Sequence, residues 1–256
     1  MPCAWFLRRI NVTFERIHHQ FIAQILYALD GSMLLEANCL FGGGTVIALR
    51  YGEYRESMDI DFLVSDVAGY RGLRQKLTGP TGIKAIMRDA AAPLTQVREI
   101  RSDQYGIRTM LMVADQPIKF EIVLEGRIEL EKPGAGDEVC GVATLTPLDM
   151  LASKLLANSD RWNDDGVFNR DVIDLAMMTP SLPMLRKAVA KAEQAYGQSI
   201  CQDLDKAISR LQNRHDWLDH CMRAMAMNIP LAVLWKRVRA LRRVLPQPPG
   251  GTSRGA

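Results

Sequence analysis

The stretch Gly42-Gly43-Gly44-Thr45, followed by Arg55-Glu56-Ser57-Met58-Asp59-Ile60-Asp61-Phe62, joins a glycine turn to two closely spaced acids. Residues 38–41 favour a short strand that ends at the glycines, and residues 46–51 favour a helix that begins at the turn. Residues 58–62 alternate acidic and apolar side chains, which is the period of a strand with two different faces. Asp59 and Asp61 should therefore leave one face of this strand, and Ile60 and Phe62 the other, toward the core.

The two aspartates are candidate metal ligands. Carboxylates held a few ångströms apart repel, and each raises the pKa of the other unless a positive charge lies between them. A divalent ion removes this conflict, and ligation by oxygen alone suits Mg²⁺, or Mn²⁺. Because Mg²⁺ bound in this way commonly takes phosphate oxygens as further ligands, Asp59 and Asp61 indicate nucleotide chemistry.

The glycine turn is a candidate phosphate cradle. Between a strand and a helix, Gly43 and Gly44 let backbone N–H groups approach an anion closely, and the helix N-terminus adds its positive dipole end. The hydroxyl group of Thr45 is a further donor. An Asp-x-Asp on a strand is more often a solvated face, and a glycine triplet is more often a plain turn. The combination, with Arg55 and Ser57 just ahead of the acids, is far more specific.

The rest of the chain divides into an α+β part and a helical part. Up to residue 145, the periodicity predicts a helix at 12–29, a helical stretch at 66–90 that is interrupted at 79–82, and strands near 95–102, 107–114, 117–125 and 138–143. Thr146, Pro147 and Asp149 form a helix-start signal. Beyond this helix, further helices are predicted at about 169–178, 182–196, 199–212, 214–227 and 230–245. We expect a mixed sheet flanked by helices over 1–145, a helical domain over 146–245 and a disordered tail over 246–256.

Composition and charge indicate the class of protein. The chain has 256 residues and a net charge of +3, and no apolar run approaches the roughly 20 residues of a membrane span. Its start does not have the order of a secretory signal, and its five scattered cysteines suit a reducing compartment. We expect a cytoplasmic protein with free thiols and no contact with a membrane. Residues 235–243 are rich in Lys and Arg, which fits both an RNA-binding helix and an amphipathic helix with its arginines in water.

The segment Phe41-Gly-Gly-Gly-Thr-Val-Ile-Ala-Leu, with Arg55-x-Ser57-x-Asp59-Ile-Asp61-Phe62, resembles the signature of the AbiEii/AbiGii toxin nucleotidyltransferases. These belong to the polymerase-β-like superfamily and include the MenT toxins of mycobacteria. The resemblance implies a nucleotidyltransferase fold in which Asp59 and Asp61 bind Mg²⁺. It also implies that the NTP contacts a set of residues beginning at the glycine motif: Gly43, Gly44, Thr45, Arg55 and Ser57.

A third carboxylate of this superfamily lies on a neighbouring strand. Residues 118–125 place Glu121 and Glu125 opposite an apolar core face. Glu121 is the preferred metal ligand, because it lies mid-strand, where position is better controlled than at the Glu125-Gly126 end. The superfamily has aspartate at this position, so the longer side chain of Glu121 departs from the pattern.

The helical part carries the second half of the resemblance, which is Lys154…Asn158…Arg161 followed by Asn169-Arg170-Asp171-x-x-Asp174-Leu175. Lys154, Asn158 and Arg161 share one helix face. Lys154 is expected near the triphosphate oxygens, where a cation offsets charge during transfer. Asp171 is expected to orient Lys154 or to help bind the acceptor. Asn158, Arg161, Arg170 and Asp174 are supporting candidates, and for Arg170 and Asp174 an interhelical ion-pair network is the alternative.

These residues predict an enzyme that moves a nucleoside monophosphate from an NTP to an acceptor hydroxyl and releases pyrophosphate. Asp59 and Asp61 are expected to hold two metal ions, one that lowers the pKa of the acceptor hydroxyl and one that steadies the leaving phosphate, and Glu121 would complete the first. The resemblance implies the 3′ end of tRNA as acceptor, growth arrest as the outcome and a cognate antitoxin as partner. The alternatives are nucleotidyl transfer to a protein or a small molecule, and a non-catalytic module that binds nucleotide or RNA. A ribonuclease is less well supported, because no His/Lys/Glu centre with useful spacing is present.

Overall fold

A computed structural model describes residues 14–89, 91–92 and 94–246. The described part of the chain begins with the helices α1 (Ile17–Ala28) and α2 (Gly31–Glu36). The first part of the sheet region then contains β1 (Cys39–Gly42), α3 (Gly43–Arg50), β2 (Ile60–Val64), α4 (Val67–Thr78) and the 3-10 helix η2 (Gly82–Ile86). Three longer strands and a short hairpin complete this region: β3 (Thr95–Ser102), β4 (Gly106–Val113), β5 (Gln116–Leu124), β6 (Glu138–Val139) and β7 (Val142–Ala143).

Five of these strands form one mixed sheet in the order β1-β2-β5-β4-β3. The pair β2–β5 is parallel, and the other pairs are antiparallel. The register places Asp61 beside Glu121 across the parallel pair and beside Gly42 across the β1–β2 pair. Asp61 and Glu121 therefore share one face of the sheet.

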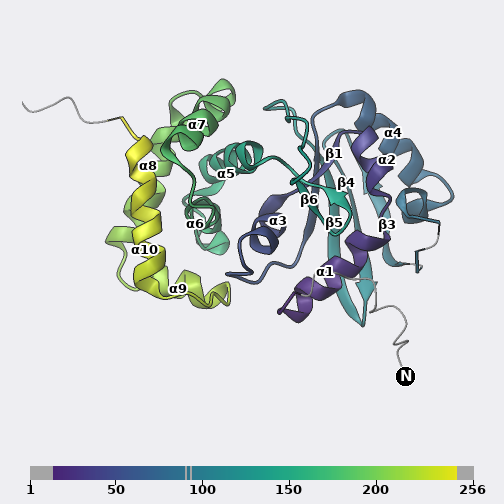
Figure 1. Cartoon of the computed structure of the whole chain (residues 1–256), viewed down its shortest axis with the longest axis horizontal. Coiled ribbons are helices and arrows are strands. Elements are labelled where there is room, and N and C mark those ends of the chain that lie inside the picture. The colour runs from purple at the N-terminus through teal and green to yellow at the C-terminus, as the bar shows by residue number, and fades with distance from the viewer. Residues whose placement is uncertain (1–13, 90, 93, 247–256) are drawn as a thin grey trace, which may run out of the picture.

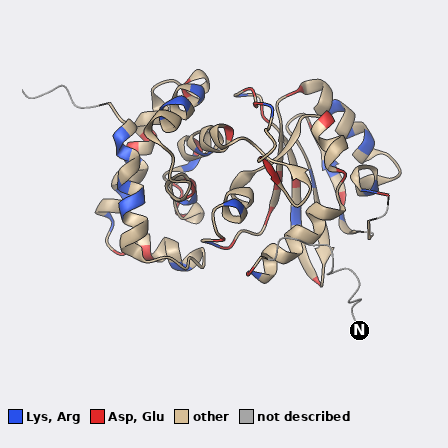
Figure 2. Cartoon of the chain, in the orientation of Figure 1, with Lys and Arg blue, Asp and Glu red and all other residues tan. Residues whose placement is uncertain are grey.

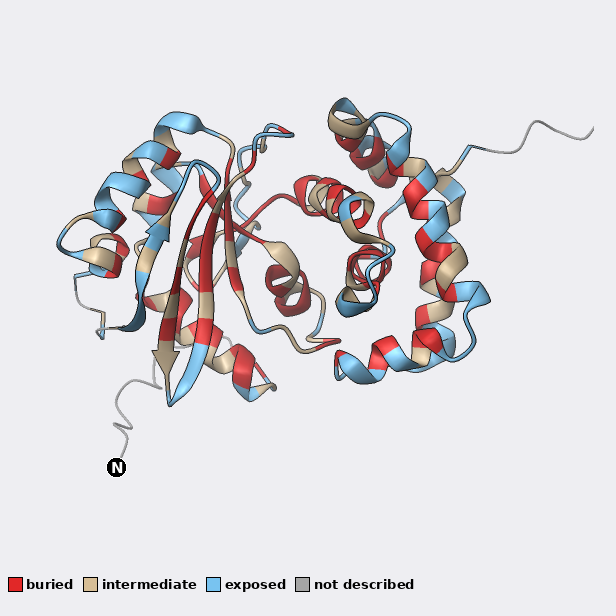
Figure 3. Ribbon diagram, turned by 180° about the vertical axis from the view of Figure 1, so that it is seen from behind, coloured by how far each residue is buried: buried red, intermediate tan, exposed pale blue. Residues whose placement is uncertain are grey.

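The opposite face of the same three strands is apolar. Phe41, Phe62 and Phe120 are buried in a row across β1, β2 and β5, with ring centroids 5.5 and 5.6 Å apart. Each buried ring stabilises the fold by about 1.5–3 kcal/mol relative to leaving it in water. In Figure 3 the buried residues concentrate on these central strands, whereas the edge strand β3 is largely exposed.

The helical region begins at α5 (Pro147–Arg161), where the Thr146 side chain accepts a hydrogen bond from the N–H of Asp149. The remaining elements are η3 (Asp165–Val167), α6 (Arg170–Met177), α7 (Leu182–Tyr196), α8 (Ser199–Asn213), α9 (Trp217–Ala224), α10 (Leu231–Ala240) and η4 (Leu241–Val244). Helix α5 packs against α6, α7 and α8. Helix α3 contacts both α5 and α6, so it joins the helical region to the sheet (Figure 1).

The predicted α+β fold with a mixed sheet is confirmed, and two local predictions need correction. Gly31 was expected only to end the first helix, but it begins α2, because Asp30 accepts a hydrogen bond from the N–H of Met33. The strand predicted at 138–143 is a hairpin, because Cys140 and Gly141 adopt positive φ and form its turn. Residues 247–256 of the predicted tail lie outside the described residues. None of the described helices is long and apolar enough to cross a membrane.

Candidate active site

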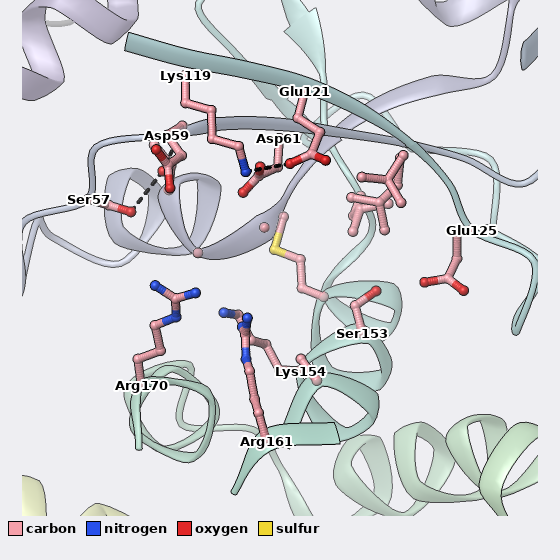
Figure 4. Close-up of a pocket in the computed structure, with 18 of the residues that line it drawn as sticks. Ser57, Asp59, Asp61, Lys119, Glu121, Glu125, Ser153, Lys154, Arg161 and Arg170 are labelled. Atoms are coloured by element: carbon pink, nitrogen blue, oxygen red, sulfur yellow. Dashed lines mark hydrogen bonds and ion pairs between the residues drawn. The ribbon is translucent and has the colours of Figure 1, made fainter. Parts of the chain in front are cut away.

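A pocket of about 290 Å³ lies where the acidic face of the sheet meets α5 and α6 (Figure 4). The β2 and β5 strands and the turn before α3 form one side, and the two helices form the other. The pocket brings together most of the predicted site residues: Gly43, Gly44, Thr45, Arg55, Ser57, Asp59, Asp61, Glu121, Lys154, Arg161 and Arg170. Three predicted residues, Asn158, Asp171 and Asp174, are buried outside its lining.

Asp59 and Asp61 form the acidic side of the pocket (Figure 4). Burial raises the pKa of Asp61, and the neighbouring Asp59 carboxylate raises it further, so both charges together are costly without a cation. The pair fits Mg²⁺, which often takes only one or two carboxylates from the protein and completes its shell with water and substrate phosphates. Among the described residues, no cluster of three or more His, Cys, Asp or Glu side chains is arranged to hold a metal. The acidic side therefore suits a metal bound together with substrate.

The glycine turn is needed for the shape of this acidic side. Gly43 has a φ of +70°, and a Cβ there would lie 2.5 Å from Oδ2 of Asp61. A Cβ on Gly44 would collide with the Arg55 guanidinium. The two glycines therefore make room for the protein's own acid and arginine, in addition to leaving the N-terminus of α3 open to an anion.

Thr45 and Ser57 hold the loop that leads into Asp59. The buried hydroxyl of Thr45 donates to the carbonyl oxygen of Asp59 at 2.5 Å and lies 2.8 Å from Oγ of Ser57. A phosphate contact from this hydroxyl would have to replace the bond to Asp59. Thr45 thus positions the acid, and its predicted contact with the nucleotide stays a prediction.

A buried histidine supports the same loop from α1. Nε2 of His19 accepts a hydrogen bond from the N–H of Ser57 at 3.2 Å, and Nδ1 lies 2.7 Å from Glu53 Oε1. Nε2 can accept only when it carries no proton, so the neutral ring donates from Nδ1 to Glu53. Burial lowers the pKa of His19 despite the opposing effect of Glu53, which keeps the ring neutral. The sequence analysis did not identify His19, because a histidine within an amphipathic helix forms no motif with the distant loop.

Behind the pocket, Asp174 is fully buried among polar partners. The Arg55 guanidinium donates two hydrogen bonds to its carboxylate, at 2.7 and 2.9 Å, and the Tyr54 hydroxyl donates a third at 2.5 Å. Nζ of Lys154 pairs with the same carboxylate at 2.6 Å. Arg55 and Asp174 thus belong to an ion-pair network, which is the alternative that the sequence left open for Asp174.

Lys154 is held in place from two sides. Besides its contact with Asp174, its Nζ donates to Asp171 at 2.9 Å. Arg161 binds the Asp171 carboxylate through two hydrogen bonds, at 2.7 and 3.0 Å. Burial opposes the charge on Asp171, but Lys154 and Arg161 hold its pKa well below the usual range. The geometry therefore agrees with the expectation that Asp171 orients Lys154.

The helical side of the pocket is positively charged. Lys154, Arg161 and Arg170 point from α5 and α6 toward the acids (Figure 4). Within the described part of the chain, Arg170 forms no ion pair, so its guanidinium is available to a bound anion. Asn158 is buried, with no hydrogen-bond partner for its Nδ2 among the described atoms. Its supporting role stays a prediction.

Glu121 is beside Asp61 as predicted, but it has cationic partners that the sequence analysis missed. Its carboxylate pairs with Nζ of Lys119 at 2.5 Å and with Nε of Arg108. The Lys119-x-Glu121 spacing, which puts both side chains on one strand face, was the available signal. The partnership with Arg108 depends on the β4–β5 register and has no local signature.

The chain is similar in sequence to one protein family and in structure to two solved proteins. The sequence model of the family described as nucleotidyl transferase AbiEii toxin, type IV TA system, matches residues 24–242, a range that includes every predicted site residue. Two solved structures from Helicobacter pylori are similar at 17% identity: a candidate nucleotidyltransferase and JHP933. The match to the first covers 89% of this chain and 94% of that chain, with a TM-score of 0.48. For JHP933 the shares are 89% and 91%, with a TM-score of 0.47. No curated protein matches the chain.

Proposed function

Because this chain belongs to the AbiEii nucleotidyl transferase family of type IV toxins, we propose a specific nucleotidyl transfer for its pocket. The enzyme moves a nucleoside monophosphate from an NTP, bound with Mg²⁺ or Mn²⁺, to a hydroxyl of RNA and releases pyrophosphate. The acceptor is the 3′ end of tRNA, and the cellular outcome is growth arrest that a cognate antitoxin prevents. The observation that carries the proposal is the acidic side, Asp59 and Asp61, facing the cationic side across one pocket.

The two sides of the pocket contact different parts of the substrate. The backbone N–H groups at the start of α3 and the guanidinium of Arg170 bind triphosphate oxygens. Lys154, already held by Asp171 and Asp174, stabilises the negative charge that develops as pyrophosphate leaves, without having to reorganise. Asp59 and Asp61 hold the divalent ion, which when bound neutralises phosphate charge and favours deprotonation of the acceptor hydroxyl.

The bond changes follow from this arrangement. The acceptor hydroxyl releases its proton to water, and its oxygen bonds to the α-phosphorus. The bond between that phosphorus and the pyrophosphate oxygen breaks, and its electron pair leaves with pyrophosphate. The protein contributes positioning and fixed charge. Its substrate must therefore lie between β2 and α5, where the acids and Lys154 meet.

The surface of the helical region supports a large anionic acceptor. Lys and Arg follow α10 (Figure 2), and Lys236 and Arg239 are exposed there. Other arginines of the predicted basic stretch contact the protein instead, since Arg242 pairs with Asp205 at 3.3 Å and Arg243 donates to the Pro180 carbonyl. The basic stretch therefore fits both interpretations of its sequence. Arg242 and Arg243 contact the protein, and Lys236 and Arg239 are exposed, where they can contact a phosphate backbone.

The decisive experiment is a transfer assay with each labelled NTP in turn, Mg²⁺ and total RNA. We expect one NTP to label the tRNA fraction, and Asp59→Asn to reduce labelling by about 1,000-fold or more, because the divalent ion loses a ligand. Asp115→Asn, an exposed aspartate in the turn after β4, is the matched control and should keep full activity. Failure of every NTP to label any acceptor, or unchanged labelling with Asp59→Asn, would refute the proposal. Label in protein or in a small molecule would identify a different acceptor.

A further inference from the structure

The acidic side of the pocket contains a lysine that the proposed contacts with the nucleotide do not use. Lys119 lies on β5 two residues before Glu121, so both side chains leave the same face of the sheet. Nζ of Lys119 is 2.5 Å from Oε2 of Glu121. Figure 4 shows this ammonium group beside the carboxylates of Asp59 and Asp61, opposite the cations of α5 and α6.

Glu121 is held by cations on both of its oxygens. Lys119 pairs with Oε2, and Arg108 of β4, which faces Glu121 in the antiparallel register, pairs with Oε1. Arg108 is itself fixed by Asp103 at 3.1 Å. Burial alone would raise the pKa of Glu121, but the two cations outweigh burial and lower it. The carboxylate is therefore ionised, and its charge is already matched within the protein.

The acidic side of the pocket therefore already contains one positive charge, the ammonium group of Lys119. Lys119 lines the same pocket as Asp59 and Asp61, and Figure 4 shows its ammonium group beside both carboxylates. A second divalent ion at this face would meet the ammonium group, which repels it. A single divalent ion balances the charge of both aspartates, and their attraction offsets its repulsion by the ammonium group, whereas a second ion would find no unbalanced aspartate charge.

We propose that Lys119, held by Glu121, is a fixed cation of the metal site, and that Glu121 is a positioning residue and not a metal ligand. Lys119 and Arg108 match the charge of Glu121, and a single divalent ion supplies the two positive charges that Asp59 and Asp61 need. This inference rests on the proposed binding of a divalent ion by these two aspartates. It replaces the assignment of Glu121 as third ligand that the resemblance to polymerase-β-like enzymes implied.

The test is a titration of the full chain with MnCl₂, followed by calorimetry and by electron paramagnetic resonance of the bound ion. We expect one bound Mn²⁺ per chain, and an affinity about tenfold higher for Lys119→Met, because a like charge has been removed from the site. Lys119→Arg keeps the charge and should bind Mn²⁺ as the unchanged protein does. Lys84→Met, an exposed lysine of η2, is the matched control.

The double variant Lys119→Met, Glu121→Gln decides the role of Glu121, because it preserves the net charge of the site. We expect its Mn²⁺ affinity to stay within about threefold of the unchanged protein, whereas Asp61→Asn weakens binding by about tenfold or more. An equal loss in the double variant and in Asp61→Asn would show that Glu121 is a ligand. Unchanged affinity in Lys119→Met would also overturn the proposal.

This readout does not depend on catalysis. If no NTP is transferred but the variants bind Mn²⁺ in the expected order, the proposed function fails and the role of Lys119 stands. If transfer occurs but the double variant loses Mn²⁺ binding, the role of Lys119 fails and the proposed function stands. Thermal melting of each variant identifies any that does not fold, and Lys119→Arg still tests the fixed charge in that case.

Discussion

At the scale of single residues, the glycine turn shows how tightly the acidic side is built. Gly43 has a positive φ, and a Cβ added at this position would collide with the carboxylate of Asp61. A side chain at this position therefore meets two separate obstacles, one in its own backbone and one in its neighbour. The Asp61 carboxylate therefore requires a glycine at position 43, whether or not the turn binds a phosphate.

Gly43→Ala should therefore lower both activity and stability. We expect nucleotidyl transfer to fall by about 100-fold or more, because Asp61 must move away from its position in the pocket. The positive φ should cost about 1–2 kcal/mol of unfolding free energy. The transfer assay and urea unfolding measure the two effects separately.

Gly52→Ala is the matched control for this variant. Gly52 has a φ of +83°, but a Cβ there would meet no atom within 4 Å. This variant should lose a similar amount of stability and keep its transfer activity. Equal activity losses in the two variants would show that backbone strain, and not displacement of Asp61, explains the effect.

At the scale of elements, the imidazole ring of His19 connects α1 to the loop before β2 through hydrogen bonds. His19 donates to Glu53 and accepts from the backbone of Ser57, so a helix near the N-terminus fixes the approach to Asp59. Both contacts use the neutral ring. Protonation would remove the acceptor at Nε2 and loosen the loop.

We therefore expect the protein to lose stability as the pH falls below about 6.5, the ordinary pKa of histidine. The pKa of His19 is lower in the folded protein than in the unfolded chain. Below 6.5 the unfolded chain takes up a proton that the folded protein resists, so the free energy of unfolding decreases until the folded pKa is reached. Urea unfolding between pH 7.5 and 5.5 measures this slope.

His19→Gln should flatten the slope, since glutamine does not titrate. His215→Gln is the comparison variant at the surface, where the His215 side chain is 93% exposed and pairs with its neighbour Asp216. The explanation fails if the slope of His19→Gln matches that of the unchanged protein.

At the scale of the whole molecule, one buried carboxylate connects the sheet region with the helical region. Asp174 of α6 binds Arg55 and Tyr54 from the loop before β2 and Lys154 from α5. The acids and the cations face each other across the pocket because this network holds the two regions at a fixed spacing. Asp174 lies behind the pocket lining, whereas its partners Arg55 and Lys154 reach the pocket.

Asp174→Ala should destabilise the protein by about 3–5 kcal/mol, because it leaves the buried guanidinium of Arg55 without its partner. Asp219→Ala is the control: Asp219 pairs with Arg223 on the surface of α9, where such a pair contributes about 0.3–0.5 kcal/mol. Urea unfolding compares the two variants. Similar losses would show that the network contributes no more than a surface ion pair.

The sequence by itself determined the features that depend on near neighbours. The alternation around Asp59 and Asp61 predicted both acids on one strand face. In the structure Asp61 lies on β2 and Asp59 directly precedes it, and both line the pocket. The Thr146-Pro147 signal began α5 at its correct residue. These rules act over two to four residues, which is the range of backbone geometry and capping. Recognition of the family pattern then brought Lys154 and Asp171 into the same site.

Only the tertiary structure decided which charges meet. Arg55 and Asp174 are 119 residues apart in the chain, and Arg108 reaches Glu121 only through the β4–β5 register. The Thr45 hydroxyl donates its hydrogen bond to the Asp59 carbonyl oxygen, and the position of this oxygen depends on the path of the loop before β2. Side-chain partners across a fold depend on register and packing, which no short stretch of sequence encodes. The positions of the acids therefore followed from the sequence, and the partners that hold them in place did not.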